Sequence, residues 1–222
     1  IFDRHRKSGA SLSEVSYGAA IRLCGRLGQN RRALSLWDEV QNSTVWYGND
    51  TAVRVACCMV DAVARTGDVQ MAASLLDMMR DRGKQLNRAD WSQILQSCRK
   101  AAAPAAAWNL YGQMLANSVK PNVIVFSHLM GAHSNSSVAA IRNVIHNMTK
   151  SKVKPDTPFV EEHIGALLGT RYFGSPKQAR FAVRSSNQTH CSEALDVIQK
   201  SRQQGLKTSK LLQCVEKALK ER

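Results

Sequence analysis

A pattern of apolar residues recurs along this chain in units of 34 or 35 residues, with one short insertion after the first unit, and this repeat restricts the possible folds more than any other feature of the sequence. In each copy, four positions follow the spacing i, i+3, i+4, i+7, which is one face of an α-helix. A second stripe with the same spacing begins 16 residues later in three copies and 15 residues later in the fourth. We therefore predict a unit of two short helices joined by a turn.

The four units carry eight such stripes. The upstream stripes are Tyr17, Ala20, Ile21, Cys24; Ala56, Met59, Val60, Val63; Trp91, Ile94, Leu95, Cys98; and Phe126, Leu129, Met130, His133. The downstream stripes are Ala33, Leu36, Trp37, Val40; Ala72, Leu75, Leu76, Met79; Ala107, Leu110, Tyr111, Met114; and Ile141, Val144, Ile145, Met148. The predicted units are 14–48, 53–87, 88–122 and 123–156, with residues 49–52 as a small insertion.

A two-helix unit cannot bury its apolar stripes alone, so stacked neighbours must cover them. This predicts an all-α protein, an α-solenoid of two-helix repeats. An ordinary helical bundle is the alternative, but it does not require a fixed period. Ile1, Phe2 and His5 match the end of a second stripe, so residues 1–13 are predicted to be the tail of a preceding unit. The chain is then expected to be a processed or partial piece with more repeat upstream.

Residues 157–222 have a weaker pattern and are predicted to be degenerate helical repeats ending in a C-terminal cap. Regular spacing favours two further pairs, 157–190 and 191–222. The segment SEALDVIQKSRQQGLKTS looks more like the second helix of a unit than the first. In that alternative register, one helix is missing near residues 170–175.

Three segments carry a resemblance to a known family: VSYGAAIRLCGRLGQNRRALSLWDEV, NRADWSQILQSCRK with AAWNLYGQMLANSVKPN, and VIVFSHLM with IRNVIHNMTKSKVKPD. Each has an early aromatic residue in the first helix and a small or apolar residue opening the second. These segments resemble pentatricopeptide repeats, and the resemblance covers residues 1–156. The rival is the tetratricopeptide repeat, usually a peptide-binding scaffold, whose Trp and Leu-Gly pattern is not present.

The resemblance implies binding of single-stranded RNA at about one base per repeat. In the family, the residue after the early aromatic and the residue closing the unit read the base together. The matching residues here are Gly18, Cys57, Ser92 and Ser127, with Gly48 or the 49–52 insertion, Asn87, Asn122 and Asp156 as the closing residues. By family analogy, Ser92 with Asn122 selects adenine and Ser127 with Asp156 selects guanine. Gly18 and Cys57 depart from the readable pattern, and Ser92 and Ser127 as ordinary small residues remain an open alternative.

The resemblance also implies base-stacking and phosphate-contacting residues. Val15 and Ile124 match the apolar stacking position, whereas Arg54 and Ala89 do not. The residues matching the phosphate position are Arg26, Arg65 and Lys100. A helix C-terminus also favours cations, so these basic residues have a structural alternative.

The net charge of +14 makes a polyanion the first partner to consider. No uncharged apolar run approaches the roughly 20 residues of a membrane span. The six cysteines form no C-x-x-C pair and are predicted to be buried, reduced thiols. Neither the deaminase signature, nor clustered nuclease aspartates, nor a phosphate-binding P-loop is present. We therefore expect no catalytic residue, metal, cofactor or small-molecule substrate.

The predicted function is non-catalytic RNA binding in an organelle, with the mitochondrial matrix first and the plastid second by family resemblance. A structural subunit of a ribonucleoprotein such as the mitochondrial ribosome, held by rRNA and neighbouring proteins, is favoured. A free factor that reads a short transcript sequence for stability, processing or translation is the first alternative. A protein-binding scaffold with no RNA is the second.

Overall fold

The computed structural model describes residues 13–42, 50–66, 68–81, 83, 85–134, 136–170 and 175–222. All regular structure in these ranges is α-helical, which confirms the predicted class. The chain divides into two compact units, residues 1–119 and 120–222. Of the predicted tail 1–13, all but the last residue lies outside the described residues.

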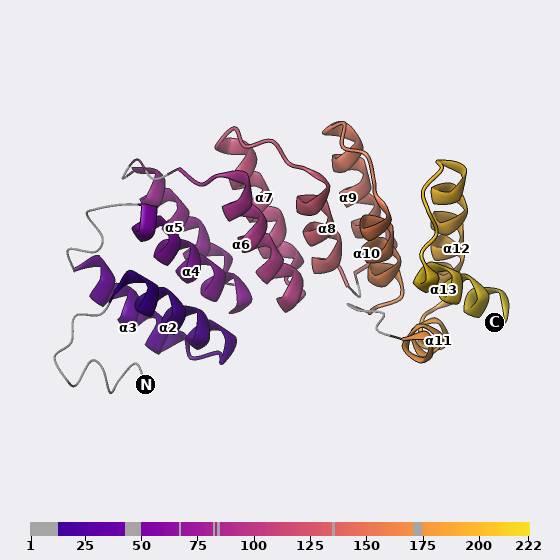
Figure 1. Cartoon of the computed structure of the whole chain (residues 1–222), viewed down its shortest axis with the longest axis horizontal. Helices are drawn as coiled ribbons and strands as arrows, with labels where there is room; N and C mark the ends of the chain where they lie inside the picture. The colour runs from indigo at the N-terminus through magenta and orange to yellow at the C-terminus, as the bar shows by residue number, and fades with distance from the viewer. Residues whose placement is uncertain are drawn as a thin grey trace. The chain divides into compact units, whose positions relative to one another are not determined.

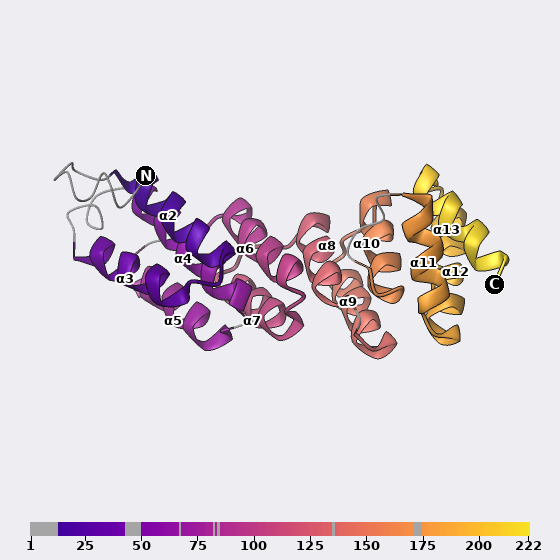
Figure 2. The same ribbon diagram turned by 90° about the horizontal axis from the view of Figure 1, so that it is seen from below.

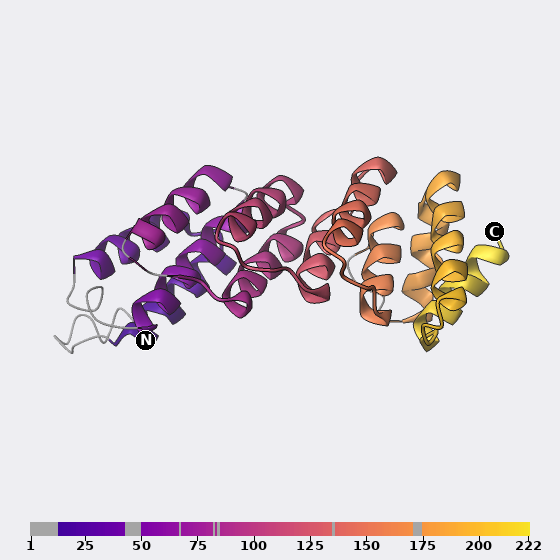
Figure 3. The same ribbon diagram turned by 90° about the horizontal axis from the view of Figure 1, so that it is seen from above.

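Unit 1 is built from three helix pairs. Its helices are α2 (Glu14–Arg26), α3 (Asn30–Gln41), α4 (Asp50–Thr66), α5 (Val69–Asp81), α6 (Arg88–Ala101) and α7 (Pro104–Ala116) (Figure 1). The first helices of the pairs, α2, α4 and α6, pack side by side in one row, and the second helices, α3, α5 and α7, form the other. Figures 2 and 3 show these two rows from opposite sides. This arrangement is the stacked-pair architecture of a helical repeat.

Burial follows the predicted stripes closely. Every stripe residue is buried except Tyr17, Ala20 and Ile145, which are half-buried. The residues of each stripe therefore form the core between neighbouring helices, as the period predicts. The proposed insertion is one difference, because residues 50–52 form the first turn of α4.

Unit 2 begins with a regular pair and then departs from it. Its helices are α8 (Val123–Ala132), α9 (Val138–Lys150), α10 (Thr157–Leu167), α11 (Pro176–Ser185), α12 (Gln188–Gln203) and α13 (Lys210–Lys220). α8 and α9 are a first and a second helix, and α10 packs on α8 as the next first helix. The contacts of α10, α11 and α12 determine which helices of residues 157–222 are first helices and which are second helices.

The regular pairing of residues 157–190 and 191–222 is wrong, because α12 runs antiparallel to α10. The Thr157 hydroxyl at the start of α10 donates to the carbonyl of Lys207, just past the end of α12, at 3.1 Å. Arg142 of the second helix α9 contacts Glu193 of α12 at 2.7 Å. Successive first helices of a stacked repeat run parallel, so α12 takes the place of a second helix.

Two further contacts align α11 and α13 with the first helices. The hydroxyl of Ser186, after α11, donates to the carbonyl of Leu168, after α10, at 3.2 Å. Arg222, after α13, donates to the carbonyl of Val183, near the end of α11, at 2.7 Å. α10, α11 and α13 therefore run in one direction. The eight residues between α10 and α11 are too few for a three-turn helix with its two turns, so the register with one missing helix is the one found.

Two helix backbones of unit 1 approach each other closely at Gly25 of α2. A Cβ added there would lie 2.6 Å from both Cα and Cβ of Ala62 on α4. Because backbone atoms would have to move, we expect Gly25→Ala to lower the free energy of unfolding by about 1–3 kcal/mol. The measurement is chemical denaturation followed by circular dichroism.

Gly112 of α7 is the matched control. It also lies inside a helix, but its Cβ would meet nothing within 4 Å. Gly112→Ala should therefore raise stability by about 0.5–1 kcal/mol through the lower entropy of the unfolded chain. Equal effects of the two substitutions would contradict close packing of α2 on α4.

Candidate nucleic-acid interface

The predicted stacking position, two residues before the first stripe residue of each repeat, is exposed, and in two repeats it holds a large apolar side chain. Val15 on α2 is 73% exposed and Ile124 on α8 is 51% exposed. Arg54 and Ala89 occupy the same position on α4 and α6 and are also exposed. Core packing does not explain these side chains. The predicted stacking residues Val15 and Ile124 are therefore accessible to a ligand in their respective units.

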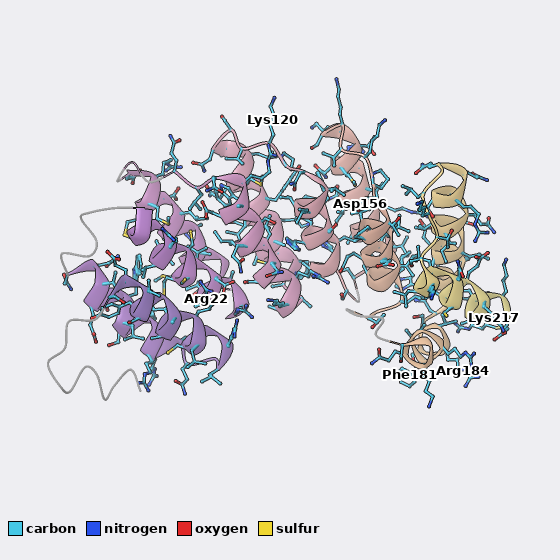
Figure 4. The ribbon with its side chains drawn as sticks, viewed as in Figure 1. Arg22, Lys120, Asp156, Phe181, Arg184 and Lys217 are labelled. Carbon is cyan, nitrogen blue, oxygen red and sulfur yellow. The ribbon has the colours of Figure 1, made fainter. Side chains whose placement is uncertain are left out.

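In unit 1 a cavity of about 240 Å³ lies where Gly18 lacks a side chain. Its lining includes Val15, Arg22, Arg54 and Cys58. The Arg22 guanidinium, labelled in Figure 4, donates to the Cys58 thiol at 3.0 Å. This hydrogen bond is the main cause of the raised pKa of Arg22. The volume is below the range of about 300–1,000 Å³ typical of small-molecule sites.

The closing residues of three units serve as helix N-caps. The Oδ1 of Asn87 accepts from Ala89 N at 2.7 Å, that of Asn122 from Val125 N at 3.1 Å, and that of Asp156 from Phe159 N at 2.9 Å. Capping alone accounts for Asn or Asp at these positions. One polar atom of each side chain is still left for a ligand. That atom is an amide nitrogen donor in Asn87 and Asn122 and a carboxylate acceptor in Asp156.

The helix residues predicted to share base reading differ in accessibility. Ser127 is half-buried, and its hydroxyl donates to the carbonyl of Val123 at 3.0 Å, which leaves its lone pairs as acceptors. Ser92 is also half-buried. Cys57 is only 9% exposed, and burial strongly raises the pKa of its thiol, so it offers little to a base.

The predicted pairs have different structural support. Ser127 and Asp156 belong to α8 and to the cap of α10, two adjoining first helices of unit 2. Ser92 and Asn122 come from different units, so their pairing stays a prediction. Gly48, proposed to close the first unit, lies outside the described residues.

The three predicted phosphate contacts are not equivalent. Arg26 ends α2 and is exposed. Lys100 on α6 is also exposed, and its Nζ donates to Oε1 of Gln96 at 3.3 Å. Arg65 instead lies 3.4 Å from the carboxylate of buried Asp61, one turn earlier on α4. Arg65 therefore already has an anionic partner, whereas Arg26 and Lys100 lie on the surface.

Sequence reasoning missed a long region without acidic residues. Between Asp90 and Asp156 the chain contains no Asp or Glu. Its seven basic residues are Arg99, Lys100, Lys120, Arg142, Lys150, Lys152 and Lys154. This region includes Ser92, Asn122 and Ser127. A count of charges along the printed sequence was enough to find it, and it favours an anionic partner there.

Other kinds of site find little support among the described residues. No group of three His, Cys, Asp or Glu side chains in the described ranges is placed to hold a metal ion. A search of the same ranges finds no helix with the length and hydropathy of a membrane span. All six cysteines are free thiols, and only Cys214 is not buried. Burial raises the pKa of Cys98 to about 12, as expected for a packed, unreactive thiol.

Comparisons with known proteins identify the repeats. The family model for a pentatricopeptide repeat domain matches residues 60–136, and the model for a single PPR repeat matches residues 15–45. Residues 15–45 and 60–136 are therefore pentatricopeptide repeats. A curated pentatricopeptide repeat-containing protein of Arabidopsis thaliana is 22% identical to it over 170 residues, which is 76% of this chain and 30% of the relative. This PPR chain thus spans less than a third of that relative's length.

Solved structures share the fold of this PPR protein. The pentatricopeptide repeat protein PPR10 from maize aligns over 95% of this chain and 27% of its own, with a TM-score of 0.68 and 16% identity. The same protein in complex with an 18-nt psaJ RNA element aligns over 96% of this chain and 28% of its own, with a TM-score of 0.57 and 18% identity. The PPR domain of Arabidopsis thaliana protein-only RNase P 1, in complex with tRNA, aligns over 91% of this chain and 95% of its own. The TM-score is 0.54 and the identity is 14%.

His163 of α10 is a buried titratable group of unit 2. It is 7% exposed, and burial lowers the pKa of its imidazole from 6.5 to about 4, against a weaker opposing effect of Glu193. No partner for its Nε2 lies among the described residues. At neutral pH it is therefore a neutral side chain within the packing of α10 and α12.

This burial predicts a loss of stability in acid. Between pH 6.5 and pH 4 the unfolded chain binds a proton at His163 that the folded chain does not bind, so folding becomes less favourable as pH falls. From pH 7 to pH 5 the loss should be about 2 kcal/mol larger in the parent than in His163→Leu. Urea unfolding at each pH measures it. His146→Leu, on an exposed part of α9, is the control, and identical pH profiles of all three proteins would contradict the prediction.

Proposed function

We propose that this PPR protein binds single-stranded RNA along its first helices and performs no chemistry on it. The observation that carries the proposal is the exposure of the stacking position in each unit, at Val15 of unit 1 and at Ile124 of unit 2. Ser127 and the Asp156 cap belong to the same unit as Ile124, and the sequence from Asp90 to Asp156 has no acidic residue in between. Apolar surface supplies stacking area, cap side chains supply one free polar atom each, and the basic balance supplies attraction to phosphate. The RNA complexes of the maize and Arabidopsis neighbours agree with this proposal.

Asp156→Asn tests base reading without loss of the cap, since Asn and Asp cap helices equally well. It replaces a carboxylate acceptor with an amide donor, and family analogy then changes the preferred base from guanine to adenine. We expect the affinity ratio for two RNA decamers that differ only in that base to shift by about tenfold toward adenine. Fluorescence anisotropy at fixed salt measures it.

Asp156→Ala is the matched control for the cap. It should cost about 1 kcal/mol of stability and abolish the preference for either base. An unchanged affinity ratio in Asp156→Asn would refute base reading at Ser127 and Asp156, while RNA binding by the parent would remain.

We further propose that the protein is a structural subunit of an organellar ribonucleoprotein such as the mitochondrial ribosome, contacting rRNA and neighbouring proteins. Two observations favour this role over a transcript-specific factor. Gly18 and buried Cys57 leave two repeats without a readable residue, which shortens any specific site. Exposed Lys120, Lys152 and Lys154 lie on the turns between helices, where structured RNA can bind.

Sedimentation of tagged protein from organelle lysate, followed by sequencing of crosslinked RNA, separates these roles. Cosedimentation with a ribosomal subunit and crosslinks confined to rRNA is the expected result. Light fractions with crosslinks on a few transcripts would favour the transcript factor. Absence of any RNA crosslink would favour a protein-binding scaffold and refute RNA binding itself.

A further inference from the structure

The irregular helix α11 has an exposed face that repeat periodicity does not explain. Its inner face contributes Ala179, Ala182 and Val183 to the packing with α13. Its outer face exposes Phe181, which is 74% accessible. In Figure 4, Phe181 and Arg184 lie on the side of α11 that faces away from α13. Burial in the fold therefore does not account for the aromatic side chain.

Basic residues surround this phenylalanine. Lys177, Phe181 and Arg184 fall at i, i+4 and i+7, so they share one helix face, and Arg180 precedes the phenylalanine. All four side chains are exposed. No ion pair in the described ranges joins Lys177, Arg180 or Arg184 to a carboxylate. The sequence itself holds no Asp or Glu from 163 to 192.

We propose that this α11 face, formed by Lys177, Arg180, Phe181 and Arg184, binds a single-stranded RNA segment by stacking one base on Phe181. The positive charge selects a polyanion, and the exposed aromatic ring selects a polyanion with unpaired planar groups. A duplex presents no free base face, and an apolar peptide gains nothing from three cations. A single-stranded nucleic acid therefore fits both features at once.

This contact lies outside the pattern of one base per repeat. α11 packs on α13 and not on an antiparallel second helix, so it adds no complete repeat unit. It adds affinity that does not depend on base identity, because every base can stack on an aromatic ring. The inference deepens the proposed function, since it rests on RNA as the ligand.

Phe181→Ala tests the stacking contact. The side chain is exposed, so the variant should fold like the parent, which circular dichroism checks. We expect its affinity for a 12-nucleotide oligouridine to fall at least about fivefold, the low end for one aromatic stacking contact. Phe181→Trp, which keeps an aromatic ring, should bind with the affinity of the parent. Leu23→Ala, at another exposed apolar residue, 55% accessible on α2, is the control and should bind like the parent.

The charges are tested by salt dependence. Lys177→Gln with Arg184→Gln should reduce the slope of log affinity against log salt by roughly 0.7 per charge removed. An unchanged slope would overturn the electrostatic part of the inference. A 4-thiouridine probe should also crosslink to the peptide containing residue 181 in the parent.

Each remaining outcome has a defined meaning. Equal oligouridine affinity of the parent and Phe181→Ala would overturn the inference and leave the proposed function standing. A parent that binds no RNA would overturn both. A parent that is dimeric and a Phe181→Ala protein that is monomeric by sedimentation would instead assign the α11 face to self-association and overturn the inference.

Discussion

Every two-helix unit of this protein depends on its neighbours to cover its apolar residues. In unit 1 the interface between first helices is tight enough that Gly25 of α2 lies against the backbone of Ala62 on α4. Such packing specifies the spacing of the first helices, and that spacing determines where the residues at the predicted stacking position lie. Val15 and Arg54 line one cavity because α2 and α4 approach this closely. The candidate interface is therefore a consequence of core packing in the row behind it.

The closing residues of the repeats combine two tasks that are compatible. Asp156 accepts the Phe159 amide with one oxygen and so begins α10. Its other oxygen is left for a ligand, and an N-cap has little freedom to move because its backbone anchors the helix. Asn at the same position caps equally well but offers a donor instead. Ligand preference at this position can therefore change with little effect on stability, which a core residue would not permit.

The sequence was sufficient for the helices and for most of the core, because a 3.6-residue period and a 35-residue repeat both depend on local patterns. It was also sufficient to expect an accessible residue at Val15 and Ile124, through resemblance. For Cys57 the sequence indicated two roles, a buried thiol and a base-reading residue, and the structure supports burial because α4 lies between two neighbouring first helices. The ion pair of Arg65 with Asp61 could have been expected, because the two residues are four apart on one helix, whereas the burial of Asp61 depends on packing. Spacing alone also misplaced α12, since helix direction depends on long-range contacts such as that of Thr157 with Lys207.

The loss of one second helix changes what the end of the array can present. α12 fills the second-helix place beside α10 and is joined to α9 by the ion pair of Glu193 with Arg142. α11 and α13 are then both first helices, and α11 has no closing residue of its own to complete a reading pair. The outer residues of α11 therefore do not need to select a base. Phe181 among its cations is suited to holding an RNA strand and not to distinguishing one base from another. This agrees with the small number of base-reading positions in the protein.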